Sequence, residues 1–521
     1  MEQARKGISE DWLALCLGLL IFVLGLGVFG GIDVLGWGIK TNVWTDISKA
    51  LTPASSKLLD ETGAITRIEG TKVVFRKADG KEATAEDTAA SSLKVGDKYT
   101  KKGMSGLTAL VLTYLFMLVV MGVGARLMGA DLGKFVFGFT IVFWIAYGCW
   151  LLGHNAYIAA TPDTVKKFNI AWSLKLTGEA GFIVALIAGL IVGNFFPRLA
   201  ALLSEATRPE LFIKTAIVVL GAGLGAKAAE QMNLATAVLF RGLCASIEVY
   251  LIDFAVVYLV ARTLFGFSRE WAVPLASGIS ICGVSAAIAT GAAIRARPVV
   301  PIMVSSLVVI FAVVELLLLP FLAQAFLWTE PMVAGDWMGL AVKTDGAAVA
   351  SAAIVDSLVR AKAAAVGIHY KEGWMVMSAT TSKIFIDFFI GIWAFILAFI
   401  WCSKIEGKGE CKPIEIWHRF PKFVIGYFLT FILMLVVSLS SAGALKDAKT
   451  ATGQMDVFRV LFFVLTFFSI GAVSNFRKLW EEGFGKLAAV YFLCLFGFII
   501  WVGLLISWIF FHGVKPPLVA G

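Results

Sequence analysis

Small residues dominate the stretch Gly278-Ile279-Ser280-Ile281-Cys282-Gly283-Val284-Ser285-Ala286-Ala287-Ile288-Ala289-Thr290-Gly291, which lies inside a hydrophobic segment of membrane-spanning length. Gly, Ser and Ala leave space unfilled, so the backbone here must come close to another helix or to a ligand. In lipid, irregular backbone persists only where protein buries it or where it lines a cavity. The stretch therefore predicts a broken helix within a bundle.

A second run of small residues follows and adds two charges: Lys343-Thr344-Asp345-Gly346-Ala347-Ala348-Val349-Ala350-Ser351-Ala352-Ala353. Paired broken helices in one polytopic chain indicate a transport site near the middle of the bilayer. Small residues also mark tight helix packing, which would explain either segment alone. Two such segments in related contexts favour transport.

The composition places the chain in the membrane. Hydrophobic residues make up 59% of the sequence, charged residues 16%, and mean hydropathy is +0.85, whereas about a quarter of a soluble domain is charged. The 41 Phe and 16 Trp suit a bilayer core with aromatic interfaces. Basic cytoplasmic loops explain the net charge of +9 better than nucleic-acid binding does.

Nothing in the sequence indicates soluble catalysis. The seven cysteines are scattered, only four histidines occur, and no CxxC or Cys/His cluster is present. A P-loop and a nucleophile elbow are also absent from the sequence. We therefore expect no enzyme activity, no metal site and no cofactor beyond a coupling ion.

Hydropathy divides the chain into about thirteen segments long enough to cross or largely cross a bilayer. We predict four parts: a first transmembrane helix in 1–38, an extramembrane β-rich insert in 39–103, accessory transmembrane helices in 104–176, and a transporter core with an internal repeat in 177–521.

The insert shows strand periodicity. Polar and apolar residues alternate from Ala64 to Arg76, and a turn is expected at residues 78–81. A closing strand is expected at residues 92–100. The insert is either a binding element or a decorated loop.

The distribution of Lys and Arg predicts the orientation. Short loops that would face inward, if the N-terminus is cytoplasmic, hold more basic residues than the matching outer loops. We expect a multi-pass protein of the plasma (inner) membrane, with residues 39–103 outside the cytoplasm.

Weak self-similarity indicates an internal repeat. The small-residue segment 219–227 precedes a long helix at 235–260, and the segment 468–478 precedes a long helix at 486–510. The two broken segments form a further pair, each followed by a long apolar helix.

Ser280-Ile281-Cys282-Gly283-Val284-Ser285-Ala286-Ala287 resembles the SICGaSA signature of the YeiH-type sulfate exporter family. The resemblance covers about residues 181–511. Supporting matches lie at 189–194, at 219–224, at Lys383 after Thr380 and Thr381, and at 421–426.

This resemblance implies an all-α polytopic membrane protein: an inverted-repeat bundle with two discontinuous crossing helices, in the group that includes sodium/proton antiporters and bile-acid symporters. The chain departs from the family's hDTaqVvAA motif, in which Asp345 matches but Gly346 and Ala348 replace Thr and Gln. The arginine that follows the family's lysine is also missing after Lys383. These departures leave the cargo open.

A helix broken at midplane exposes N–H groups that attract anions and carbonyls that attract cations. We expect the substrate at the breaks and the helix after the second one, with these residues: Ser280, Cys282, Gly283, Ser285, Thr344, Gly346, Ser351, Thr381 and Lys383. Lys343 or Lys383 would supply the counter-charge, unless its side chain extends to the membrane interface instead.

Carboxylates inside apolar runs are functional candidates by default. We expect Asp345, Glu315 and Asp387 to carry the coupling ion, and we assign Glu248 and Asp253 to packing.

The sequence thus predicts a secondary active transporter that moves a small anion, sulfate- or sulfite-like or a small organic acid, by alternating access coupled to H+ or Na+. Its expected partners are that anion and the lipid bilayer, with no nucleic acid; a homodimer is left open. Two alternatives remain: a membrane subunit of an ion pump driven by a partner enzyme, and a channel or sensor that uses the extracellular insert.

Overall fold

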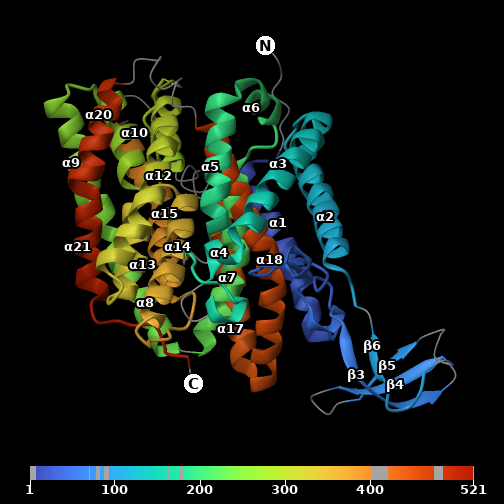
Figure 1. The fold of residues 1–521 in the computed structure, drawn as a ribbon. Coiled ribbons are helices and arrows are strands. Elements are labelled where there is room, and N and C mark those ends of the chain that lie inside the picture. The colour runs from blue at the N-terminus through green and yellow to red at the C-terminus, as the bar shows by residue number, and fades with distance from the viewer. Residues whose placement is uncertain are drawn as a thin grey trace.

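The computed structural model describes residues 8–519 except 70, 78–81, 87–92, 102, 161–164, 175–177, 179, 231, 298, 402–420 and 475–484. Helices form one bundle, and a small β-sheet projects from one of its ends, at lower right in Figure 1. Within the described residues, nine helices are long and apolar enough to cross a membrane, or up to ten if a bent pair counts as one span. The predicted all-α polytopic membrane class is confirmed.

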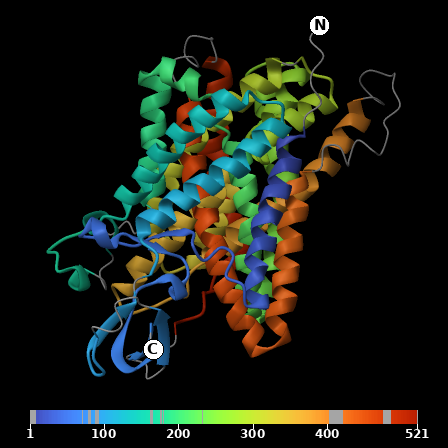
Figure 2. The same ribbon diagram turned by 90° about the vertical axis from the view of Figure 1, so that its right-hand side faces the viewer.

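Three N-terminal helices cover one side of the bundle (Figure 2). Each begins at a side-chain cap, because Ser9, Ser105 and Asp131 accept backbone N–H groups of the first turn. Their bounds are α1 (Glu10–Gly25), extended by the 3-10 turn η1 (Leu26–Gly30), α2 (Gly106–Leu127) and α3 (Leu132–Gly153), followed by the short α4 (Ala156–Ala159).

The insert contains the predicted β-hairpins. A four-stranded antiparallel sheet has the order β5-β4-β3-β6, and a separate pair joins β1 to β2. The strands are β1 (Ile39–Thr41), β2 (Leu51–Pro53), β3 (Glu61–Glu69), β4 (Lys72–Lys77), β5 (Glu82–Glu86) and β6 (Lys98–Lys101). Alternate side chains, including Phe75 and Tyr99, form a small core on one face.

Two details of the insert differ from the prediction or fall outside it. The closing strand begins only at Lys98, because a turn in which Asp97 donates to the Lys94 carbonyl precedes it. The turn predicted at 78–81 lies outside the described residues.

Close helix contacts at glycines hold the centre of the bundle together. A Cβ on Gly189 or Gly193 of α5 would collide with the backbone of α18, and one on Gly221 or Gly225 of α7 would collide with the backbone of α17. These i, i+4 pairs of small residues let backbones approach, as is common between membrane helices. The helices concerned are α5 (Ala180–Phe195), α7 (Pro209–Glu230), α17 (Lys422–Ser440) and α18 (Ala442–Val473), with α6 (Pro197–Leu203) bent by 114° from α5.

The remaining long helices surround the two small-residue segments. One of them, residues 232–264, contains two π-helical stretches, which often mark functional sites. In chain order these helices are α8 (Met232–Glu248), η6 (Val249–Asp253), α9 (Phe254–Leu259), η7 (Val260–Leu264), α12 (Val299–Phe326), α15 (Trp374–Ile400), α20 (Gly485–Cys494), η9 (Leu495–Ile499) and α21 (Ile500–Phe511).

The first small-residue segment is a helical hairpin. The arms α10 (Arg269–Ser280) and α11 (Val284–Ala293) are joined by a turn at 281–283, where Gly283 has φ +71°. At the open end of the hairpin, Glu270 Oε1 lies 3.0 Å from Nε of Arg297. These residues are 27 positions apart, so the chain must turn back on itself rather than continue across the bundle.

The second segment is also a helical hairpin, with arms α13 (Pro331–Ala341) and α14 (Asp345–Ala364) joined at 342–344. Both arms lie beside the start of α15. A Cβ on Gly335 of α13 would meet the Met375 carbonyl, and Asp356 of α14 accepts the Met375 N–H at 3.3 Å. The two arms are therefore antiparallel neighbours.

The hairpins enter the bundle from opposite ends. Helix α12 has 28 residues, which makes it about 42 Å long. The open end of the first hairpin lies next to the start of α12, and the second hairpin begins directly after the end of α12. The predicted breaks in two segments are confirmed. The expectation of two discontinuous helices that cross the bundle is wrong, because the chain reverses at each break and the segments meet tip to tip.

Candidate functional site

The two hairpin tips, residues 281–283 and 342–344, are in contact. A Cβ on Gly283 would lie 3.0 Å from the Lys343 carbonyl oxygen and 3.3 Å from Cγ2 of Thr344. Only a glycine suits this position, because its φ is positive and the facing backbone is close. Sequence reasoning placed Gly283 and Thr344 in one site, and the structure brings them together.

Lys383 of α15 joins both tips. Its Nζ donates to the carbonyl oxygens of Ile281 at 3.2 Å, Val342 at 3.1 Å and Lys343 at 3.3 Å. These carbonyls follow the ends of α10 and α13, where backbone oxygens lack helical partners and carry partial negative charge. The three hydrogen bonds use all three N–H donors of the ammonium group.

Lys343 makes a parallel set of contacts from the second tip. Its Nζ donates to the Leu340 carbonyl at 2.5 Å and to the Ser280 carbonyl of the first tip at 3.2 Å. Asp253 Oδ2 lies 3.6 Å away and supplies the opposite charge. Lys343 and Lys383 are 0% and 1% exposed, so the alternative that either side chain extends to the membrane interface is wrong.

Glu315 of α12 holds the backbone of the second tip. Its Oε2 accepts the Lys343 N–H at 3.1 Å, and its side chain is fully buried. Asp387 lies one helical turn beyond Lys383 on the same face of α15. Two of the three carboxylates predicted to carry the coupling ion, Glu315 and Asp387, therefore lie at or near the meeting point of the tips.

Four further predicted residues lie at the tips or on the arms. Ser280 and Cys282 are buried at the first tip, and the Ser280 hydroxyl has no hydrogen-bond partner among the described residues. Thr344 is the N-cap of α14, where its Oγ1 accepts the Ala347 N–H at 3.2 Å. Ser351 lies farther along α14, fully buried.

Of the other four predicted residues, one lies away from the tips, and the structure describes the other three only in part. Thr381 packs against Gly242 of α8, on the side of α15 away from Lys383. Ser285 belongs to the first turn of α11, and Asp345 and Gly346 belong to the first turn of α14. The side chains of Ser285 and Asp345 lie outside the described part of the structure.

Sequence reasoning missed two buried carboxylates. Asp253 was assigned to packing, but the structure places it beside Lys343. It ends the π-helical stretch η6, which the sequence pattern does not reveal. Asp336 of α13 was not singled out, and both its oxygens accept hydroxyl hydrogen bonds, from Ser382 and Ser507. Its position in an apolar run shortly before the second small-residue segment was the available signal.

The site is closed in this conformation. Ile281, Cys282, Lys343 and Lys383 are each 2% exposed or less, and the lysine donors are directed to carbonyls and to Asp253. Solvent therefore does not reach the ammonium groups in this structure. The ammonium groups of both lysines thus bind the backbone carbonyls at the helix ends.

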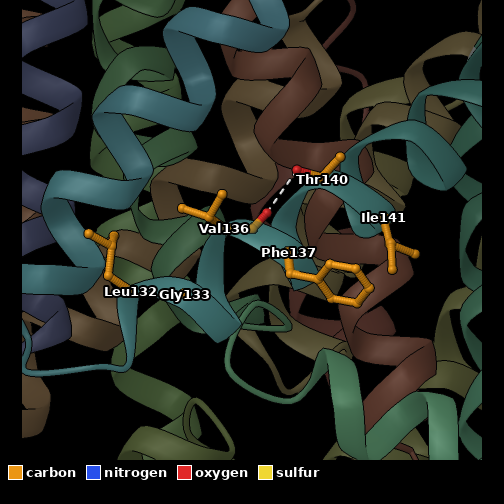
Figure 3. A pocket seen from close by; sticks show the side chains of 6 residues that line it. All are labelled: Leu132, Gly133, Val136, Phe137, Thr140 and Ile141. Atoms are coloured by element: carbon orange, nitrogen blue, oxygen red, sulfur yellow. Dashed lines mark hydrogen bonds between the residues drawn. The ribbon is translucent and has the colours of Figure 1, made fainter.

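Two surface hollows lie elsewhere. A groove of about 530 Å³ on α3 is lined by apolar side chains, and the Thr140 hydroxyl within it donates to the Val136 carbonyl of its own helix (Figure 3). Such a surface suits lipid. A cavity of about 1110 Å³ lies between the insert and the polar start of α18, and Lys40, Lys57 and Lys446 are among the residues that line it.

The hairpins, the glycine contacts and the apolar helices together define a polytopic α-helical membrane protein. The model of a protein family described as Conserved hypothetical protein 698 matches residues 169–490 of this chain. A UPF0324 membrane protein of Nitrosomonas europaea is 39% identical over 517 residues, which cover 98% of this chain and 97% of that protein. The chain belongs to the UPF0324 membrane protein family.

Other relatives support this assignment. An uncharacterized protein of Archaeoglobus fulgidus is 50% identical over 165 residues, 27% of this chain and 88% of that protein. A UPF0324 membrane protein of Nitratidesulfovibrio vulgaris is 27% identical over 441 residues, 82% of this chain and 69% of that protein. No solved structure matches the chain.

Proposed function

We propose that the protein is a secondary active transporter that moves a small anion by alternating access. The observation that carries this proposal is the pair of buried lysines where two oppositely inserted hairpins meet. Ionised side chains are costly inside a membrane protein and mark ion or substrate pathways. Here they lie among helix ends, as in transporter sites built from interrupted helices.

The lysines give a direct means of alternation. In the closed state Lys383 links the Ile281 carbonyl of the first tip to the Val342 carbonyl of the second. A bound anion offers the ammonium group charged oxygens in place of neutral carbonyls, and charge-assisted hydrogen bonds are stronger. The anion would thus loosen the link between the tips and allow one hairpin to move against the other.

The cargo class follows from the same chemistry. Two ammonium groups and small hydroxyls such as that of Ser280 suit a compact oxyanion. We propose sulfate, sulfite or a small organic acid, with H+ or Na+ as the coupling ion. The resemblance to the YeiH-type sulfate exporter family, and through it to antiporters and symporters, points the same way.

Two ion pairs support the membrane orientation that the distribution of Lys and Arg predicts. The ion pair of Glu10 with Arg208 puts the starts of α1 and α7 at one end of the bundle. Because the first hairpin turns back, Arg295 and Arg297 stay at that end with Arg269. We propose that this end faces the cytoplasm of an inner membrane and that residues 39–103 lie outside. We also propose the division of the chain into four parts, at residues 1–38, 39–103, 104–176 and 177–521.

The decisive experiment is counterflow in proteoliposomes that hold the purified protein. Vesicles preloaded with unlabelled sulfate, sulfite or a small organic acid should accumulate the matching radiolabelled anion. Lys383→Met should lower the rate at least tenfold, whereas Lys486→Met, which removes an exposed lysine, should not.

Other outcomes would favour the alternatives. If folded protein shows no counterflow for any tested anion, the transporter proposal fails. Ion flux only after a soluble partner co-purifies would indicate the membrane subunit of a pump. Flux without saturation or counterflow, abolished by deletion of residues 40–102, would indicate a channel governed by the insert.

A further inference from the structure

Asp336 occupies the middle of α13, the first arm of the second hairpin, and its side chain is 0% exposed. Its Oδ1 accepts the hydroxyl hydrogen of Ser382 on α15, and its Oδ2 accepts that of Ser507 on α21 at 2.7 Å. One carboxyl group therefore ties the hairpin arm to both neighbouring helices.

This carboxyl group has no cation beside it among the described residues. Charged residues do lie on the elements that pack against α13, and α21 contributes none of them. They are Arg241 and Glu248 on α8, Glu315 on α12, Asp345, Asp356, Arg360 and Lys362 on α14, and Lys383 and Asp387 on α15. The cations among them are engaged elsewhere: Lys383 with the tips, Arg360 with Asp356, Arg241 with the Phe510 carbonyl and Lys362 with the end of α12.

A buried carboxylate without a cation is costly to keep ionised, and such groups in membrane segments are functional candidates. We propose that Asp336 is a proton-binding site whose protonation couples proton movement to movement of the second hairpin. The inference rests on the proposed function, because it assigns the coupling ion of that transporter. The step is the binding of one proton to one carboxylate, and it needs no other reactant.

The geometry favours a proton over a metal cation. A hard cation takes roughly six or more oxygen ligands at roughly 2.0–2.6 Å, whereas the partners of Asp336 among the described residues are two serine hydroxyl groups. The 2.7 Å separation between Ser507 Oγ and Asp336 Oδ2 is a direct hydrogen bond. Each oxygen of the carboxyl group thus already has a hydroxyl hydrogen as its partner.

Protonation would change the connection to the tips. As a carboxylate, Asp336 accepts both serine hydrogens, but as a carboxylic acid it must donate its own hydrogen. One serine hydroxyl then has to rotate and accept. Ser382 directly precedes Lys383, whose ammonium group joins the two tips. A change at Ser382 is therefore passed to the group that holds the site closed.

The test compares two measurements on the same proteoliposomes. Counterflow at equal pH reports transport alone, and uptake driven by an imposed pH gradient reports coupling. In the wild-type protein an inward proton gradient should change the uptake rate severalfold. Asp336→Asn should keep counterflow within about threefold and lose the response to the gradient. Asp447→Asn, at an exposed position on α18, should behave like wild type.

The outcomes separate the two proposals. Absence of wild-type counterflow overturns the proposed function, whereas counterflow that is unaffected by a pH gradient overturns only the role of Asp336. If folded Asp336→Asn still shows the full response of uptake to the pH gradient, the proposed role of Asp336 is also overturned. If that variant does not fold, Ser382→Ala combined with Ser507→Ala keeps the carboxyl group and removes both donors. The pH midpoint of gradient-driven uptake must then shift, and an unchanged midpoint refutes the inference.

Discussion

Nζ of Lys343 lies 3.6 Å from Oδ2 of Asp253, and both side chains are almost completely buried. The two residues come from different elements, the second hairpin tip and the π-helical stretch η6. The ion pair therefore fixes the tip against the long helix that contains residues 232–264.

Loss of one partner of this pair should destabilise the protein more than loss of both. Asp253→Asn leaves the Lys343 charge buried without its counter-charge, which costs about 3–5 kcal/mol. Adding Lys343→Met removes that charge and should recover much of the loss, while anion transport stays abolished. Thermal unfolding of the single and double variants in detergent checks this. Equal melting temperatures for the two would contradict it.

Gly283→Ala should impair both stability and transport. The new methyl group would lie 2.6 Å from Cγ1 of Val308 and 3.0 Å from the Lys343 carbonyl, at φ +71°. Gly367→Ala is the matched control, because Gly367 has φ +83° with open space around it and so carries only the left-handed penalty of about 1–2 kcal/mol. Melting temperature and counterflow of the two variants should differ clearly. Equal effects would show that crowding between the tips is unimportant.

Removal of the Lys383 ammonium group should expose Cys282 at the first tip. Its thiol is 2% exposed in the closed state, so a membrane-permeant maleimide should label it slowly in a variant in which it is the only cysteine. Lys383→Met in that background should raise the labelling rate at least tenfold, because the tips lose their shared donor. An unchanged rate would argue that other contacts hold the tips together.

The ion pair at the open end of the first hairpin should contribute little at neutral pH and nothing in acid. Hydrogen bonds from Arg297 lower the pKa of Glu270, which lies at the exposed end of α10. A lowered pKa means that this contribution is present above the unfolded pKa and is lost as pH falls through the folded one.

Glu270→Gln should therefore cost less than about 1 kcal/mol at pH 7, and the difference from wild type should vanish at low pH. Melting curves of both proteins from pH 7 to pH 3 test the sign. A difference that grows as the pH falls would contradict it.

Much of the candidate site could be predicted because its signals are local. Small residues around Gly283 and Gly346 mark places where a helix cannot continue undisturbed, and charged residues within apolar runs, such as Lys383 and Glu315, stand out against their surroundings. Partners far away in the chain could not be predicted this way. Asp253 meets Lys343 across 90 positions, and nothing near Asp253 in the sequence indicates it.

The sequence by itself determined that this chain is a polytopic membrane protein with two interrupted segments, because composition and helix-breaking residues act over short distances. Only the tertiary structure decided that each segment turns back and that the two tips meet. That direction depends on contacts between distant residues, such as Glu270 with Arg297 and Lys383 with Ile281. The carbonyls at the tips become a binding site for lysine ammonium groups only when three separate parts of the chain are folded together.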